Sequence, residues 1–280
     1  AKKYFKKVDD FAPAKQYLNA IENNQVLQNP YSYNSKNQSS ENNQSSNTDK
    51  AKKIYEEINS NFESKNYQKV LEMLQPAIKA IESGKISDAK YIQFIYYYKT
   101  FSEFYLKNYT DAVKSATMVI NNSDDKDIGG MYFLRATAKN EIGDYYGSNS
   151  DYDFLIENSS RINYTENSLA TLLNNKAYNY VLLKDYKSAQ PLINKAIILD
   201  KEKEYIWGTK GELEYHLGQY NEAIKSTSNS INIAQNGNAF LFRGLSFIKI
   251  GKKSEGCKDL SKAGELGENS SYDEIKKYCK

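Results

Sequence analysis

Few residues of the kinds that carry out chemistry occur in this chain, and they are widely spaced. Its 280 residues include one histidine, His216, and two cysteines, Cys257 and Cys279. A histidine base needs a nucleophile within hydrogen-bond reach, and no Ser or Cys shares the local pattern of His216. Two thiols and one distant histidine cannot complete a four-ligand zinc site. We therefore expect no enzyme, no metal and no cofactor, with His216 as a hydrogen-bonding residue of a surface or groove.

Two short segments share single features with ligand-binding loops. Residues 121–130, NNSDDKDIGG, are acidic and end in glycine, but they lack the alternating ligands and the terminal Glu of a calcium loop. Residues 143–148, GDYYGS, are not followed by the Lys of a phosphate-binding loop. Both segments are predicted to be turns of a repeat architecture.

Composition narrows the class of protein further. The chain has 38 Lys and Arg against 35 Asp and Glu, a net charge of +3, so bulk charge does not favour nucleic acid as a partner. No stretch approaches the roughly 18 apolar residues of a membrane-spanning helix. Mean hydropathy is −0.75, so the core must come from well-spaced apolar positions. The 25 Tyr and 11 Phe are the unusual feature, and their location decides what the chain can bind.

An internal repeat of 33 to 34 residues organises the chain. Segments beginning at Asn174, Trp207 and Phe240 align through small residues and a shared turn. The aligned positions are Ala177, Gly211 and Gly244; Lys184, Gly218 and Gly251 at the turn; Ala189, Ala223 and Gly256; and Ala196, Ser230 and Ala263. Each unit is predicted to be two amphipathic helices, with small residues at their contact and a Tyr, Tyr186 or Tyr220, after the turn.

The period, the small residues and the pattern of Trp207, Gly211 and Ala223 resemble the tetratricopeptide repeat (TPR) family, most strongly over residues 170–267. This resemblance implies an all-α, right-handed superhelical solenoid. Weaker upstream copies extend it to about six hairpins, which begin near residues 51, 93, 129, 170, 204 and 237. The wider gaps between some starts predict longer connections or extended helices at about 80–92 and 156–169.

The repeats divide the chain into four parts. Residues 51–267 are predicted to form the solenoid, and residues 1–22 resemble a partial repeat. Residues 23–50 are rich in Asn, Gln and Ser, with too few aliphatic side chains to offset the entropy of ordering, so a flexible insert is expected. Residues 268–280 are predicted to contain a capping helix that covers the apolar face of the last repeat.

The two cysteines could join this cap to the last repeat. If one helix ends near Leu266 and an antiparallel one starts near Ser271, Cys257 lies nine residues before the turn and Cys279 eight after it. At about 1.5 Å per residue these depths agree within roughly 2 Å, which permits a disulfide. A pair of small buried thiols in the same contact explains the spacing equally well.

A second resemblance concerns location. The C-terminal pieces GCKDLSKAGELG and IKKYC are similar to endings of exported TPR proteins of Bacteroidetes-type bacteria. This similarity and an initial Ala1 in place of Met favour an exported protein, periplasmic or associated with the outer membrane. A cytoplasmic location and a lipoprotein or peripheral membrane association both stay open.

In a solenoid of this kind the first helix of each hairpin lines the concave face, where extended or helical protein segments bind. In residues 94–105, apolar and aromatic side chains surround the helix, so some must face outward or toward a partner. The repeat frame also places Glu212 on the concave face. The candidate partner-binding residues are Tyr97, Tyr98, Phe101, Tyr105, Phe133, Asn175, Tyr178, Tyr205 and His216, although many of these aromatics fit core packing as well.

TPR proteins that grip the acidic tail of chaperones use a clamp of Lys, Asn and Arg side chains. Asn175 matches one clamp position, but residues such as Thr209 and Asn238 occupy the basic ones, so a chaperone-tail adaptor is not expected. The leading hypothesis is a non-catalytic scaffold or adaptor, a subunit of a larger complex, that holds a partner protein in an aromatic-lined groove. The alternative is an exported glycan- or small-ligand-binding TPR lipoprotein.

Overall fold

The structure is a computed structural model that describes residues 54, 56–123, 128–161 and 165–279. Every regular element within these ranges is a helix. The described residues form two compact units, divided between Gly143 and Asp144. The predicted partial repeat at 1–22 and the predicted insert at 23–50 lie outside the described residues.

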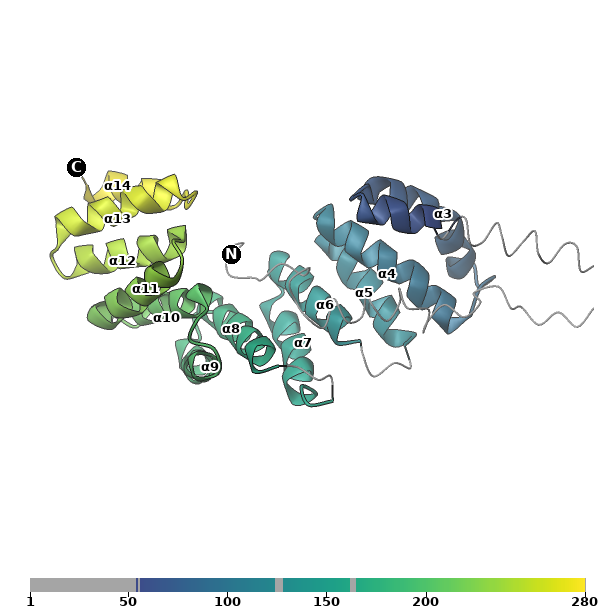
Figure 1. Cartoon of the computed structure of the whole chain (residues 1–280), viewed down its shortest axis with the longest axis horizontal. Coiled ribbons are helices and arrows are strands. Elements are labelled where there is room, and N and C mark those ends of the chain that lie inside the picture. The colour runs from purple at the N-terminus through teal and green to yellow at the C-terminus, as the bar shows by residue number, and fades with distance from the viewer. Residues whose placement is uncertain (1–53, 55, 124–127, 162–164, 280) are drawn as a thin grey trace, which may run out of the picture. The chain divides into compact units, whose positions relative to one another are not determined.

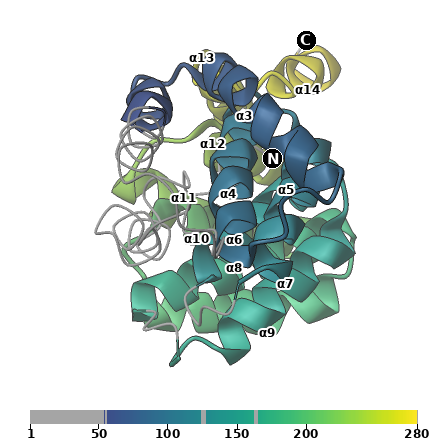
Figure 2. The same ribbon diagram turned by 90° about the vertical axis from the view of Figure 1, so that its right-hand side faces the viewer.

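The N-terminal unit is built from successive packed helices (Figure 1). Residues 56–63 are helical and precede α3, so these two elements match the first predicted hairpin. In the middle of the unit α4 packs on both α3 and α5, and α5 packs on α6 (Figure 2). The bounds are α3 (Tyr67–Glu82), α4 (Ala89–Tyr105), α5 (Tyr109–Asn121) and α6 (Gly129–Glu141).

The aromatic side chains of α4 form the core of this unit. Phe62, from the first helical segment, meets Tyr98 and Phe101 edge to face at ring-centroid distances of 5.1 and 6.1 Å. Tyr105 stacks on Tyr67 of α3 at 4.7 Å. The expectation that some apolar side chains of residues 94–105 face outward or toward a partner fits Phe104 and Tyr105 alone, because a helix packed between neighbouring hairpins buries more than one stripe. Buried are Phe94, Ile95, Tyr96, Tyr97, Tyr98 and Phe101; Phe104 and Tyr105 are half-buried.

The C-terminal unit continues the predicted pattern of hairpins. The pairs α8–α9, α10–α11 and α12–α13 each pack internally, and consecutive pairs pack through α9 on α10 and α11 on α12. The all-α solenoid of TPR-like hairpins predicted from the repeat is confirmed. The bounds are α7 (Tyr145–Glu157), α8 (Glu166–Leu182), α9 (Tyr186–Leu199), α10 (Glu204–His216), α11 (Tyr220–Ile233), α12 (Gly237–Lys249), α13 (Lys253–Glu265) and α14 (Ser271–Tyr278).

Two first helices are one turn longer than the others. Helices α4 and α8 have 17 residues each and begin four residues before the repeat starts expected at 93 and 170. Capping side chains fix these earlier starts, because Asp88 accepts a hydrogen bond from the Tyr91 amide and Thr165 accepts one from the Ser168 amide. Helices α6, α10 and α12 begin at the expected residues 129, 204 and 237.

The turns inside the hairpins share one backbone conformation. The aligned residues Lys184, Gly218 and Gly251 have φ angles of 59°, 75° and 85°, in the left-handed region. A residue in this conformation ends a helix tightly, and glycine adopts it without the steric cost of a Cβ atom. Lys65 and Lys107 adopt it in the first two hairpins.

The small residues of the repeat lie where two helices come into backbone contact, as predicted. A Cβ atom on Gly244 of α12 would lie 2.9 Å from the carbonyl oxygen of Gly256 of α13. On Gly211 of α10 it would lie 2.4 Å from the Thr227 methyl group of α11. Ala177 and Ala189 are fully buried at the equivalent contact of α8 and α9.

Substituting Gly256→Ala tests this contact. The new Cβ would lie 2.7 Å from the Gly244 oxygen and 2.6 Å from Ile248 Cγ1, so we expect the free energy of unfolding to fall by about 1 to 3 kcal/mol. Ala favours helix over Gly by about 1 kcal/mol, so a net loss must come from the contact. Urea unfolding followed by circular dichroism measures it. The exposed Lys258→Ala on the same helix is the control, and an equal midpoint for both variants would contradict the close packing.

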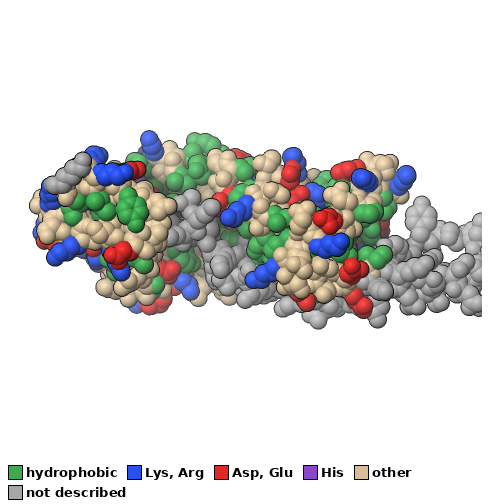
Figure 3. Space-filling view, turned by 90° about the horizontal axis from the view of Figure 1, so that it is seen from above, with side chains coloured by type: hydrophobic (Ala, Val, Ile, Leu, Met, Phe, Trp, Pro, Cys, Tyr) green, Lys and Arg blue, Asp and Glu red, His purple; other side chains and the backbone are tan. Residues whose placement is uncertain are grey.

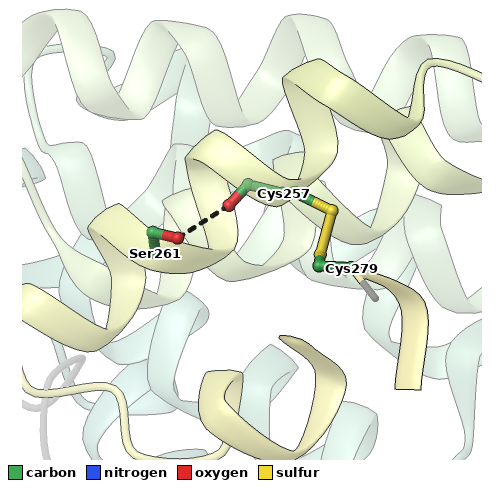
Figure 4. The surroundings of a disulfide bond; sticks show 3 residues. All are labelled: Cys257, Ser261 and Cys279. Atoms are coloured by element: carbon green, nitrogen blue, oxygen red, sulfur yellow. Dashed lines mark hydrogen bonds between the residues drawn. A yellow bond between two sulfur atoms is a disulfide. The ribbon is translucent and has the colours of Figure 1, made fainter. Parts of the chain in front are cut away.

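A short C-terminal helix covers the last hairpin. Helix α14 packs on α13, and a Cβ atom on Gly264 would lie 2.8 Å from the Tyr272 ring. A disulfide joins Cys257 of α13 to Cys279 at the end of α14, with 5.7 Å between their Cα atoms (Figure 4). The buried-thiol alternative therefore does not describe this structure, which contains no free cysteine among its described residues.

The disulfide closes a loop across 22 positions of sequence, and by chain entropy it is expected to contribute about 3 kcal/mol. Intact-mass measurement after alkylation without reductant should find no label, and two labels after reduction. The double variant Cys257→Ser, Cys279→Ser should unfold at lower denaturant, while reduction should leave its midpoint unchanged. Two labels without reductant would show that the bond is absent.

Candidate partner-binding site

The candidate residues of the N-terminal unit lie mainly in its core. Tyr97, Tyr98 and Phe101 are between 1% and 3% exposed, and Phe133 of α6 is fully buried. Tyr105 keeps part of its surface accessible. Burial favours a packing role for the first four, and their assignment as partner contacts stays a prediction.

The candidates of the C-terminal unit lie on consecutive first helices, α8 and α10, beside polar residues of α12. Thr171 and Tyr205 join α8 to α10 through a hydroxyl contact of 2.9 Å, and Asn238 of α12 donates to Glu212 Oε2 of α10 at 2.9 Å. The negative charge of Glu212 in turn acts on Tyr178 of α8. We define the polar cluster as Asn174, Tyr178, Thr209, Glu212 and Asn238.

Helical spacing gives the remaining members of the polar cluster a common face. Asn174 lies four residues before Tyr178 on α8, and Thr209 lies three residues before Glu212 on α10. Asn174 Oδ1 and Thr209 Oγ1 are buried and make no hydrogen bond within the described part of the chain. A buried oxygen without a partner costs free energy, so these two atoms destabilise the folded chain.

Glu212 is the ionisable centre of the polar cluster. Its side chain is only 6% exposed, and burial raises its pKa to about 7, although the hydrogen bond from Asn238 opposes the shift. Glu268, in the connection between α13 and α14, raises the pKa further by charge repulsion. Glu212 therefore exchanges its proton near neutral pH, where an ordinary surface carboxyl group is fully ionised.

Tyr178 of α8 and Tyr205 of α10 stay protonated. Burial, and then the charge of Glu212, raise the pKa of Tyr178 well above its ordinary value. Burial raises the pKa of Tyr205 to about 12, although its hydrogen bond to Thr171 opposes the shift. Both hydroxyl groups therefore keep their protons at neutral pH.

Asn175 and His216 serve neighbouring contacts. Asn175 is fully buried and donates to the Tyr152 hydroxyl of α7 at 3.4 Å. His216 is exposed at the end of α10, where its ring stacks on Tyr186 at 5.4 Å and meets Phe242 at 5.6 Å. Desolvation by these surroundings, and then the charge of Lys184, lower the pKa of His216, so its imidazole is neutral at pH 7.

Sequence reasoning found part of this site. The repeat frame placed Tyr178, Tyr205 and Glu212 on the first helices, but it gave no sign that Glu212 is buried or that Asn238 bonds to it. The relevant signal is a carboxylate and an amide 26 residues apart on consecutive first helices.

In the part of the chain that the structure describes, no group of three or more His, Cys, Asp or Glu could hold a metal ion. No helix within the described ranges is long and apolar enough to span a membrane.

Known proteins match this chain in fold and not in sequence. No protein-family model matches it, and no curated protein sequence matches it. Among solved structures, BtubC (BKLC) from P. vanneervenii aligns with a TM-score of 0.54 and 15% identity, over 76% of this chain and 90% of that one. MamA 41-end from Desulfovibrio magneticus RS-1 aligns with a TM-score of 0.52 and 12% identity, over 64% and 96%.

A thermophilic TPR protein of Thermus thermophilus, TTC0263, aligns with a TM-score of 0.49 and 14% identity, over 64% of this chain and 93% of that one. Identities this low carry the fold alone. With its helix pairs, shared turns and 33- to 34-residue period, the chain has the fold of a TPR-type helical-repeat protein.

The raised pKa of Glu212 predicts how stability depends on pH. The folded state holds this proton more tightly than the unfolded state, whose Glu pKa is about 4.5, so stability falls as pH rises from 4.5 to about 7. The full cost above pH 7 is on the order of 3 kcal/mol. Glu212→Gln removes it, so this variant should gain stability relative to wild type between pH 5 and pH 8 in urea unfolding.

The exposed Glu255→Gln is the matched control, and it should show no such pH-dependent gain. If Glu212→Gln differs from wild type by the same amount at pH 5 and pH 8, Glu212 has an ordinary pKa in the folded protein.

Proposed function

We propose that this chain is a non-catalytic scaffold that holds a segment of a partner protein on the first helices of its C-terminal unit. The observation that carries the proposal is the polar cluster. Two of its buried oxygens make no hydrogen bond within the described residues, and its carboxyl group is desolvated. Folding alone gains nothing from such an arrangement, whereas a bound segment could supply the missing donors. Helical-repeat folds supply surfaces suited to this use.

The surroundings of the ionisable residues support a binding role over catalysis. His216 is flanked by the rings of Tyr186, Tyr215 and Phe242. Glu212 contacts the Asn238 amide and acts on the Tyr178 hydroxyl. A catalytic pair would need a nucleophile beside a base, and these neighbours supply none.

The same evidence bears on the ligand and the location. Sugars stack on exposed aromatic faces, and the burial of Tyr97 and Tyr98 gives no support to the glycan-binding alternative. The disulfide supports our proposal of an exported protein, because such bonds persist in oxidising compartments. We further propose that the chain works as one subunit of a larger complex, because a scaffold acts by binding other proteins.

Site-specific photo-crosslinking in the native cell tests the scaffold role. A photoreactive phenylalanine at position 215, beside His216 and Phe242, should give a discrete crosslinked product that mass spectrometry identifies as one partner protein. The control carries the same residue in place of Tyr146, which is 70% exposed on α7, a helix that contributes no residue to the polar cluster. Identical products from both positions, or none from position 215, would contradict the proposed face.

A further inference from the structure

Negative charge gathers at the polar cluster although the whole chain is net positive. Glu268 acts on both Glu212 and Tyr178, so two carboxyl groups influence the same place. Two other buried carboxylates each pair with a cation: Glu103 pairs with Lys99 at 2.5 Å, and Asp259 pairs with Arg243 at 2.7 Å. Within the described ranges no Lys or Arg side chain forms an ion pair with Glu212 or Glu268. Among the described side chains, the local excess around Glu212 is therefore acidic, whereas the whole chain has a net charge of +3.

The hydrogen-bonding inventory of the polar cluster points the same way. Its unpartnered atoms, Asn174 Oδ1 and Thr209 Oγ1, can both accept a hydrogen bond. Glu212 Oε2 already accepts from Asn238, while no described residue donates to Oε1. A ligand group rich in donors and without acceptors matches this set, and ammonium and guanidinium groups have that character.

Access to the polar cluster is narrow. Tyr178, Glu212 and Asn238 are between 4% and 6% exposed, and Asn174 and Thr209 are fully buried, so the slender end of a side chain matches this access better than an aromatic ring does. Over the face in view in Figure 3, acidic, basic and hydrophobic side chains are interspersed.

We infer that the polar cluster is a receptor for a cationic side chain, so that the partner segment carries a Lys or Arg that pairs with Glu212. This inference rests on the proposed scaffold function and names the chemistry of its partner. Charge complementarity sets the specificity: the carboxylate attracts the cation, and Asn238 holds the carboxylate in place.

Three ten-residue peptides test the inference on the full chain. Each peptide consists of alternating leucine and tyrosine residues and a single variable residue. The variable residue is Lys in the first peptide, Gln in the second and Glu in the third. Fluorescence anisotropy at pH 8 should show that wild type binds the Lys peptide about tenfold or more tighter than the Gln peptide, the scale of a charge-assisted hydrogen bond. Binding of the Glu peptide should be the weakest.

Variants assign the preference to the polar cluster. Glu212→Gln keeps the size of the side chain and an oxygen that accepts from Asn238, so it should fold and yet bind Lys and Gln peptides equally. Glu268→Gln, at a half-buried position, should weaken the preference without abolishing it. Glu255→Gln removes one exposed carboxylate elsewhere and should bind as wild type does.

Equal affinity of wild type for the Lys and Gln peptides, or for none of the three, would overturn the cationic inference. So would a preference for Lys that survives Glu212→Gln or that Glu255→Gln removes equally. The crosslink from position 215 depends on no synthetic peptide, so it can support the scaffold role when the peptide results reject the cationic partner.

Discussion

The structure depends on helices that approach until their backbones touch. Between α12 and α13, a Cβ atom added to Gly244 would lie only 2.9 Å from the carbonyl oxygen of Gly256. Side chains of ordinary size cannot occupy such a contact, so small residues must recur at each hairpin and the chain must turn in a few residues. Left-handed residues at positions 184, 218 and 251 make those turns. Because the close contact engages one side of each first helix, another side is left to meet the next hairpin and any partner.

That arrangement places polar side chains of successive hairpins beside each other. Thr171 and Tyr205 are 34 residues apart and share a hydroxyl contact, one full repeat from hairpin to hairpin. Glu212 and Asn238 meet in the same way across α10 and α12. Arg243 and Asp259 show the contrasting solution, a charged pair satisfied inside one hairpin by two hydrogen bonds of 2.7 and 3.0 Å. In the polar cluster Glu212 has the Asn238 amide as its partner and no cation among the described side chains, and this difference is consistent with the proposed ligand role.

Sequence reasoning was most accurate where geometry leaves little choice. Only small residues fit the contacts at Gly211 and Ala223, so their spacing predicted the hairpins. For α4 the sequence did not show how many aromatic side chains are buried, because the outward side of a single helix can be the inward side of the next contact, as Phe62 shows against Tyr98. The burial of Glu212 was invisible for the same reason, since its environment comes from three hairpins. The spacing of Cys257 and Cys279 was compatible with a disulfide and with a pair of buried thiols. Only the placement of α14 distinguishes these two alternatives.

The most direct measurement is the pKa of the Glu212 carboxyl group, followed by NMR of its carboxyl carbon in ¹³C-labelled protein. The signal is assigned through its loss in the Glu212→Gln variant. In the free chain the account predicts a pKa of about 7 for this group. Saturation with the Lys-containing peptide should lower that pKa by at least about one unit, because a nearby cation favours the ionised carboxylate, whereas the Gln-containing peptide should not lower it. A pKa near 4.5 in the free chain, or one that the Lys peptide leaves unchanged, would contradict the account.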